Sequence, residues 1–130
     1  PIYAECGGMM LLGKSIFDLE GKEHSMAGIL PFKAKKGNLK IGYRETISKN
    51  SSPITASGNK LIGHEFHRWE LITEKHSSEI KPLWDIKGWD IDIKNEGFCN
   101  HLIHASWIHL HWASSPKILD NWKRSVMKFA

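Results

Sequence analysis

A cysteine followed by two glycines near the start of the chain is the feature that points most directly to chemistry. Cys6 follows a short apolar stretch, and Gly7 and Gly8 lead into residues 9–12, which are typical of a helix. Strand, sharp turn and helix in this order make up a nucleophile elbow, whose turn holds the nucleophile in a strained backbone conformation. The N-terminus of the helix would favour the thiolate over the thiol. We therefore interpret Cys6 as an activated nucleophile; the alternative is a small buried hydrophobic residue after a strand.

A cysteine nucleophile needs an imidazole within hydrogen-bond reach, and this partner usually comes from a distant part of the chain. Of the eight histidines, four lie close together: His101, His104, His109 and His111. His109 lies in an apolar segment that could run as a strand beside the strand before Cys6, so it is the candidate base. Ordinary core or surface roles are expected for His24, His76 and His101.

Clustered histidines also raise the question of a metal site. The pair His64 and His67 lacks the H-E-x-x-H spacing that places two imidazoles on one helix face, and on a strand the two would point to opposite faces. His109 and His111 would share one face of a strand, but no third ligand is evident in the sequence. We therefore predict no metal site.

The overall composition excludes several classes of protein. A chain of 130 residues forms at most one domain. The net charge is +4, but the basic residues are scattered and form no recognition helix or basic–aromatic repeat, so we expect no nucleic-acid partner. No signal peptide or bilayer-length apolar run is visible, so we expect no membrane partner. Cys6 and Cys99 do not make a disulfide framework, and the elbow-like cysteine favours a reducing cytoplasm.

The elements that would position these residues are those of an α/β domain with a mixed sheet. Apolar patterns predict strands at 2–5, 26–32, 39–47 and 60–72, a half-exposed strand or hairpin at 84–93, and a further strand inside 95–112. Turns are expected at 18–22, 35–38 and 96–97, and a polar loop at 48–59. Helices are expected at 7–14 and from Pro116 onward, where Ser114 or Ser115 can cap. The apolar face of the second helix would consist of Ile118, Leu119, Trp122, Val126 and Phe129.

Five motifs in a specific order carry a family resemblance. They are PIYAECGGMMLLG with HSMAGILP, LKIGYRE, LIGHEFHRWE, EGFCN and ASWIHLHWASSP. Together they resemble the C-terminal part of the cobyrinic acid a,c-diamide synthase family, and the resemblance runs over most of the chain.

The resemblance implies a class I glutamine amidotransferase-like, flavodoxin-like α/β fold, with a mixed, largely parallel sheet flanked by helices. Residues 1–130 would be the C-terminal portion of that domain, incomplete at its N-terminus. We expect upstream sequence, because the chain opens with Pro1 on the strand that leads to its nucleophile. In the family an ATP-binding synthetase domain precedes the amidotransferase, so ATP and Mg²⁺ are expected in that missing domain and no cofactor in this chain. The full-length enzyme is a candidate homodimer.

The resemblance also implies roles for individual residues. Cys6 matches the nucleophile of the family and His109 its partner histidine. The backbone N–H of Gly7, just after the nucleophile, is the natural oxyanion donor of an elbow. The segment expected at the glutamine pocket comprises Gly63, His64, Glu65, Phe66 and His67.

One position departs from the wider class. Many amidotransferases have a carboxylate two residues after the histidine, and here that position is His111. The group that orients His109 is therefore left open between a backbone carbonyl, Glu65 and Glu45.

The implied activity is the glutaminase half of an ATP-dependent amidoligase. Cys6 would attack the amide of L-glutamine and release ammonia for amidation of the a and c carboxylates of cobyrinic acid, a corrinoid bound by the missing domain, in cobalamin biosynthesis. Related tetrapyrrole enzymes are the alternatives: nickel-sirohydrochlorin a,c-diamide synthase and cobyric acid synthase. A non-catalytic amidotransferase-like domain and a cysteine hydrolase independent of ATP are further alternatives. We expect little glutaminase activity from the isolated chain, because part of its oxyanion hole would come from upstream sequence.

Overall fold

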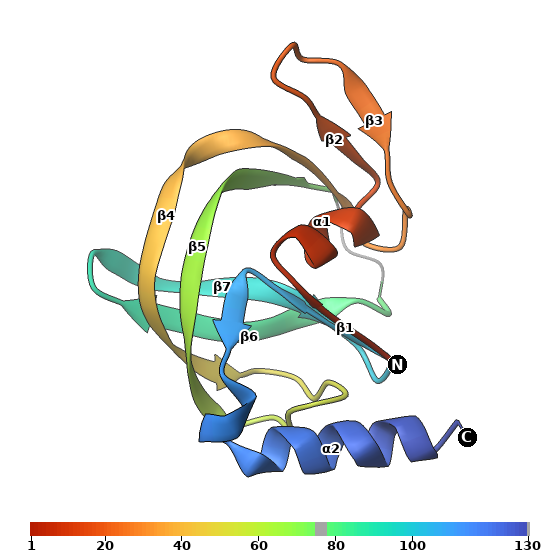
Figure 1. Ribbon diagram of the computed structural model, residues 1–130, viewed down its shortest axis with the longest axis vertical. Coiled ribbons are helices and arrows are strands. Elements are labelled where there is room, and N and C mark those ends of the chain that lie inside the picture. Colours follow the sequence, from red (N-terminus) through yellow and green to blue (C-terminus); the bar gives the residue numbers. More distant parts are fainter. Residues whose placement is uncertain (75–77, 130) are drawn as a thin grey trace.

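Two long antiparallel strands, β4 (Phe32–Ser48) and β5 (Lys60–Thr73), curve through the computed structural model, which describes residues 1–74 and 78–129 (Figure 1). The strands predicted at 39–47 and 60–72 are confirmed within them. The turn predicted at 35–38 is wrong, because β4 runs through it with an irregularity in register between Lys36 and Lys40. A bulge lets a strand absorb extra residues without ending. The expected role of His76 lies outside the described residues.

The remaining strands join these two in one sheet. They are β1 (Ile2–Glu5), β2 (Ser15–Phe17), β3 (Glu23–Ser25), β6 (Lys81–Gly88), β7 (Ile91–Cys99), β8 (Ile103–Ser106) and β9 (Ile108–Leu110). The sheet follows the order β1-β8-β7-β6-β4-β2-β3, and β5 pairs with β4 and β9. Of the strand and the hairpin predicted at 84–93, the structure shows a hairpin, formed by β6 and β7.

The predicted mixed sheet is confirmed, but the expectation that it is largely parallel is wrong. The β1–β8 and β2–β4 pairs are parallel, whereas the other described pairs are antiparallel. Short connections explain this result, because strands joined by a tight turn, such as β6 and β7, must run antiparallel.

Two further local predictions are wrong for reasons that lie elsewhere in the chain. Residues 26–31 form no strand; instead, backbone N–H groups from Met26 to Leu30 donate to carbonyls of residues 11–14, at the end of the first helix. Helix ends leave such carbonyls unpaired, and this segment satisfies them. Residues 96–97 lie inside β7, where Gly97 has φ 75° and a Cβ would lie 2.8 Å from the carbonyl oxygen of Ala105. That glycine permits a close approach of two strands and makes no turn.

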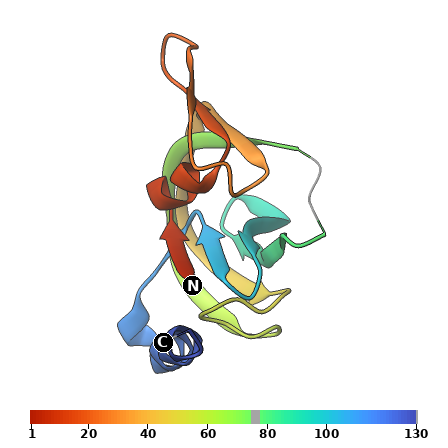
Figure 2. The same cartoon turned by 90° about the vertical axis from the view of Figure 1, so that its right-hand side faces the viewer.

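Both predicted helices are present, as α1 (Gly7–Leu12) and α2 (Pro116–Met127), with a short 3₁₀ turn η1 (Trp112–Ser114) before α2. Ser115 stands at the N-cap of α2 but makes no side-chain capping bond. The expected apolar face of α2 is only partly packed, since Ile118 is buried and Phe129 is exposed. The helix α2 and the β2–β3 hairpin lie at opposite ends of the molecule (Figure 1, Figure 2). No helix among the described residues has the length and apolar character needed to cross a membrane.

The core that supports the start of the chain lies between α1 and the sheet. Met9 and Leu12 of α1 pack with Phe32, Phe98 and Trp107, all of which are buried. A second buried cluster on β6, β7 and β9 contains Leu83, Trp84, Ile86, Cys99 and Ile108. Burial of Trp107 and Ile108 anchors the strand that carries His109.

Candidate active site

Cys6 lies at a sharp turn between β1 and α1. Its φ of 48° and ψ of −109° place a non-glycine residue at positive φ, which is uncommon and costly. The turn is held on both sides: Cys6 N donates to Ser106 O at 2.9 Å, and Met10 N donates to Cys6 O at 3.1 Å. The strand, turn and helix predicted around Cys6 are therefore present, with the backbone strain that an elbow requires.

The pKa of Cys6 is shifted in the direction opposite to the one expected. Burial raises the pKa of its thiol, a hydrogen bond from the backbone N–H of Gly7 opposes this shift, and the charge of Glu5 adds to it. The net direction is upward, so the helix N-terminus does not produce a resting thiolate. Because α1 has only six residues, its dipole is small compared with the cost of desolvating a charge. Cys6 consequently needs a proton acceptor.

The space next to Cys6 is open. A Cβ built on Gly7 would meet no heavy atom of the described residues within 4 Å, and a Cβ on Gly8 would make an ordinary contact of 3.6 Å with Ala4. Both glycines are exposed. The N–H of Gly7 faces the sulfur of Cys6, and the Cβ position of Gly7 itself lies in open space at the surface.

Cys6 and His109 converge on the same short stretch of β5. The sulfur of Cys6 lies 3.9 Å from the carbonyl oxygen of Phe66, and His109 on β9 is the register partner of His64. Directly opposed residues of an antiparallel pair project from the same face, so His109 and His64 share a face of the sheet. Both residues therefore adjoin the same short stretch of β5, although they are far apart in the sequence.

Gly63 allows the strand of His109 to approach β5. A Cβ at this position would lie 2.3 Å from Cγ2 of Ile108 and 2.7 Å from the carbonyl oxygen of His109. Gly63 pairs with Leu110 in the β5–β9 register. The absence of a side chain at Gly63 is thus a condition for the position of His109, and its place in the glutamine pocket stays a prediction.

The rest of the predicted glutamine pocket is divided between the two faces of β5. His64 and Phe66 lie on the face of His109, with the ring of Tyr43 edge-on to His64 at 5.3 Å. Glu65 and His67 are buried on the opposite face. The structure therefore places these residues on two faces of one strand, and their roles in a glutamine pocket stay predictions.

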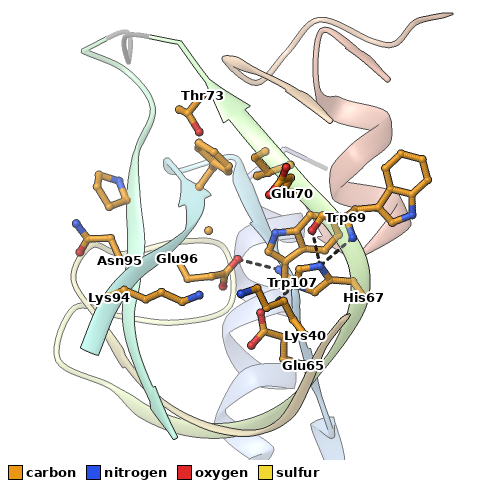
Figure 3. A pocket seen from close by; sticks show the side chains of 14 residues that line it. Lys40, Glu65, His67, Trp69, Glu70, Thr73, Lys94, Asn95, Glu96 and Trp107 are labelled. Carbon is orange, nitrogen blue, oxygen red and sulfur yellow. Dashed lines mark hydrogen bonds and ion pairs between the residues drawn. The ribbon is translucent and has the colours of Figure 1, made fainter. Parts of the chain in front are cut away.

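Glu65 and His67 belong to a polar network inside the curved sheet. Glu65 accepts hydrogen bonds from Nε of Arg44 at 2.7 Å and from Nε2 of His67 at 2.9 Å. Burial opposes ionisation of Glu65, but the bonds from His67 and Arg44 outweigh it and lower its pKa from 4.5 to about 2. The ring of His67 stacks on Trp107 at 3.9 Å, and a cavity of about 410 Å³ opens beside them, also lined by Glu96 (Figure 3). This network explains why Glu65 cannot orient His109.

The carboxylate beside His109 is Glu5, which sequence reasoning did not identify. Its Oε2 lies 3.4 Å from Nδ1 of His109. Of the carboxylates proposed from the sequence, Glu65 is committed to the buried network, and Glu45 forms an exposed ion pair with Lys87 at 2.8 Å. The available signal was that Glu5 directly precedes the candidate nucleophile.

The other histidines have varied surroundings. His24 is exposed and pairs with Asp18 at 2.7 Å, and His101 is also exposed, as expected for surface residues. His104 is fully buried between the rings of Tyr3 and Trp84, and burial lowers its pKa to about 3. Within 1–74 and 78–129, no three side chains of His, Cys, Asp or Glu gather as metal ligands would. The absence of a metal from the functional protein remains a prediction.

The fold itself defines a class of protein. A crystal structure of a glutamine amidotransferase matches it with a TM-score of 0.54 and 12% sequence identity, over 95% of this chain and 59% of that one. At this identity the likeness shows the fold alone, which is the α/β fold of class I glutamine amidotransferases.

The sequence comparison is more specific. Residues 1–117 match the CobB/CobQ-like glutamine amidotransferase domain, and the chain belongs to that family. It is similar to cobyrinate a,c-diamide synthases from Synechococcus sp. (36% identity over 98% of the chain) and Gloeobacter violaceus (38% over 88%). It is also similar to a hydrogenobyrinate a,c-diamide synthase from Mycobacterium bovis (32% over 89%). The predicted resemblance is therefore confirmed, and the chain spans 28%, 24% and 24% of the length of these relatives.

Proposed function

We propose that this chain carries the glutaminase site of an ATP-dependent amidoligase, with Cys6 as nucleophile and His109 as general acid and base. The observation that carries the proposal is the convergence of the strained Cys6 and of His109 on residues His64 to Phe66 of β5. Membership of a glutamine amidotransferase family supports L-glutamine as the substrate.

The first half of the reaction forms a thioester. The thiol of Cys6 gives its proton to His109, and the sulfur bonds to the side-chain amide carbon of glutamine. The carbonyl oxygen becomes an oxyanion, which accepts a hydrogen bond from the N–H of Gly7. The carbon–nitrogen bond then breaks, and His109 returns the proton to the departing ammonia. The raised pKa of Cys6 makes this proton transfer a necessary step.

The second half of the reaction restores the enzyme. Water attacks the thioester while His109 takes one of its protons. The carbon–sulfur bond breaks, glutamate leaves, and the proton held by His109 returns to the sulfur of Cys6. Each cycle thus converts glutamine and water into glutamate and ammonia, and neither residue is consumed.

The ammonia would serve amidation of the a and c carboxylates of cobyrinic acid. The names of the relatives support this acceptor, and the synthetase chemistry, with ATP and Mg²⁺, would occur in sequence outside this chain. We propose that residues 1–130 form the C-terminal portion of the amidotransferase domain. The thiols Cys6 and Cys99 are both free, which supports a cytoplasmic location.

The proposal is tested in the full-length protein with Cys6→Ala. We expect loss of amidation from glutamine and retention of amidation from free ammonia, because the two chemistries use separate sites. The assay is run with cobyrinic acid and, in parallel, with nickel-sirohydrochlorin and cobyric acid precursors, to identify the acceptor. Glutamine-dependent amidation by the variant at the wild-type rate would refute the role of Cys6.

A second measurement separates a catalytic site from a non-catalytic domain of the same fold. A glutamine analogue with a reactive diazoketone should alkylate Cys6 and leave Cys99 untouched, because Cys99 is fully buried whereas Cys6 is partly exposed. Peptide mass spectrometry locates the modification. Equal labelling of both cysteines, or labelling of neither, would contradict a glutamine site at Cys6.

A further inference from the structure

We propose that Glu5, the residue directly before the nucleophile, is the positioning residue for His109. It would take the place of the carboxylate that many amidotransferases have two residues after the histidine, where this chain has His111. This inference rests on the proposed roles of Cys6 and His109 and adds a third participant to them.

The two oxygens of Glu5 have different environments. Oε1 accepts a hydrogen bond from the backbone N–H of Leu110 at 2.8 Å and another from the hydroxyl of Tyr3. Oε2 lies 3.4 Å from Nδ1 of His109. Two donors therefore fix one oxygen of the carboxylate, and the other faces the imidazole. The Leu110 contact also ties the carboxylate to the strand that carries His109.

Tyr3 is itself held in place. Its ring packs edge-on against Trp112 at 5.0 Å and Trp122 at 6.4 Å, and it stacks on His104 at 5.2 Å. Burial raises the pKa of Tyr3, and its hydrogen bond to Glu5 adds to the shift, so the hydroxyl keeps its proton and remains a donor. The orientation of Glu5 is thus set by the packing of α2 and η1 against β1.

A carboxylate at Nδ1 determines which nitrogen of the imidazole is available for chemistry. The 3.4 Å separation is an ion-pair distance, and a small closure brings Nδ1–H within hydrogen-bond range of Glu5. Once Nδ1–H donates to Glu5, Nε2 is the acceptor that can take the proton of Cys6. The negative charge also stabilises the imidazolium formed in that step. Because the side chain of His109 is 43% exposed and that of Glu5 is 22% exposed, solvent screens part of the charge effect. The choice of tautomer does not depend on that screening.

The geometry predicts that the more conservative of two substitutions at Glu5 causes the larger loss of glutaminase activity. In Glu5→Gln the single amide oxygen accepts the hydrogen bonds from Leu110 and Tyr3. The NH₂ group must then turn toward Nδ1 of His109. A donor facing Nδ1 places the ring proton on Nε2, and the ring can then no longer accept from Cys6. In Glu5→Ala neither tautomer is enforced. Glu5→Gln should therefore be the more harmful substitution, although it changes the shape less.

The test measures glutaminase activity of the full-length protein. We expect Glu5→Gln to lower kcat about a hundredfold or more with little change in KM, within the range of general acid–base catalysis, and Glu5→Ala to lower it less. Nitrogen NMR of ¹⁵N-labelled histidine should show the ring proton of His109 on Nδ1 in the wild type and on Nε2 in Glu5→Gln. Glu45→Gln, an exposed carboxylate paired with Lys87, is the matched control and should leave both readouts unchanged.

Three outcomes would overturn this inference. One is a larger loss in Glu5→Ala than in Glu5→Gln, which would indicate a packing role. A second is an unchanged tautomer in Glu5→Gln. A third is a loss of ammonia-dependent amidation in Glu5→Gln, which would indicate general damage to the fold. Failure of the proposed function is distinguishable, because it appears as glutaminase activity that survives Cys6→Ala.

Discussion

The backbone of His109 passes so close to Gly63 that a single methyl group would collide with it. A Cβ at Gly63 would lie 2.7 Å from the carbonyl oxygen of His109, and 2.3 Å from Cγ2 of Ile108. Neither neighbour can yield easily, because one is backbone and the other is fully buried. The glycine that the sequence placed in a glutamine pocket also allows two strands to lie close together.

Gly63→Ala should displace β9 and with it His109. We expect a loss of stability of about 1–3 kcal/mol, as for other overpacked sites, together with reduced glutaminase activity. Hydrogen-exchange mass spectrometry of the full-length protein should show reduced protection in β5 and β9. The control is Gly8→Ala, whose Cβ makes an ordinary contact of 3.6 Å with Ala4 and adds helix propensity. Equal protection in the two variants would contradict the steric argument.

Gly7→Ala should reduce glutaminase activity without a loss of stability, unlike Gly63→Ala. The added Cβ meets no described heavy atom within 4 Å, so folding and thermal stability should be unchanged. It would, however, add bulk beside the N–H of Gly7, which we propose donates to the oxyanion of the bound glutamine. We expect glutaminase activity to fall tenfold or more, roughly the effect of misplacing a substrate by a fraction of an ångström to an ångström. Wild-type kcat/KM in this variant would show that the substrate approaches from another side.

The buried Glu65 should make the fold sensitive to acid. Its pKa is lowered from 4.5 to about 2 in the folded protein, so its ionised form stabilises the fold above pH 4.5. This contribution is lost as the pH falls from about 4.5 toward 2, when the carboxylate paired with Arg44 and His67 becomes protonated. Hydrogen exchange of β4 and β5 peptides, corrected for intrinsic rates, measures the decline.

The variant Glu65→Gln tests whether Glu65 is the source of this acid sensitivity. This variant should be less stable at pH 7, because it leaves the buried charge of Arg44 without a partner, yet its stability should decline less between pH 5 and pH 2. Glu45→Gln, at an exposed site, should decline in parallel with the wild type. A slope for Glu65→Gln identical to that of the wild type would show that Glu65 does not govern acid stability.

Local patterns were sufficient for many elements. Short-range periodicity accounts for the strand before Cys6, the helix after it, the strands at 39–47 and 60–72 and the C-terminal helix. Turn predictions based on glycine were wrong where the glycine instead allows two strands to approach closely. The pair Glu96-Gly97 suggested a turn, but Gly97 lies in β7 against Ala105. Residues 26–31 have the composition of a strand, and the free carbonyls of α1 claim their N–H groups instead.

In the candidate site, too, some features could be predicted from the sequence and others depended on tertiary contacts. From the sequence alone came Cys6 at its strained turn, Gly7 beside it, His109 on an apolar strand, and the family to which the chain belongs. These are properties of residue type and nearby order, which a sequence displays directly. The tertiary structure alone decided that Glu5 reaches His109 and Leu110, the latter 105 positions away, and that Glu65 faces away from them. That choice depends on strand register and on which face each side chain occupies, and a shift of one residue would reverse it.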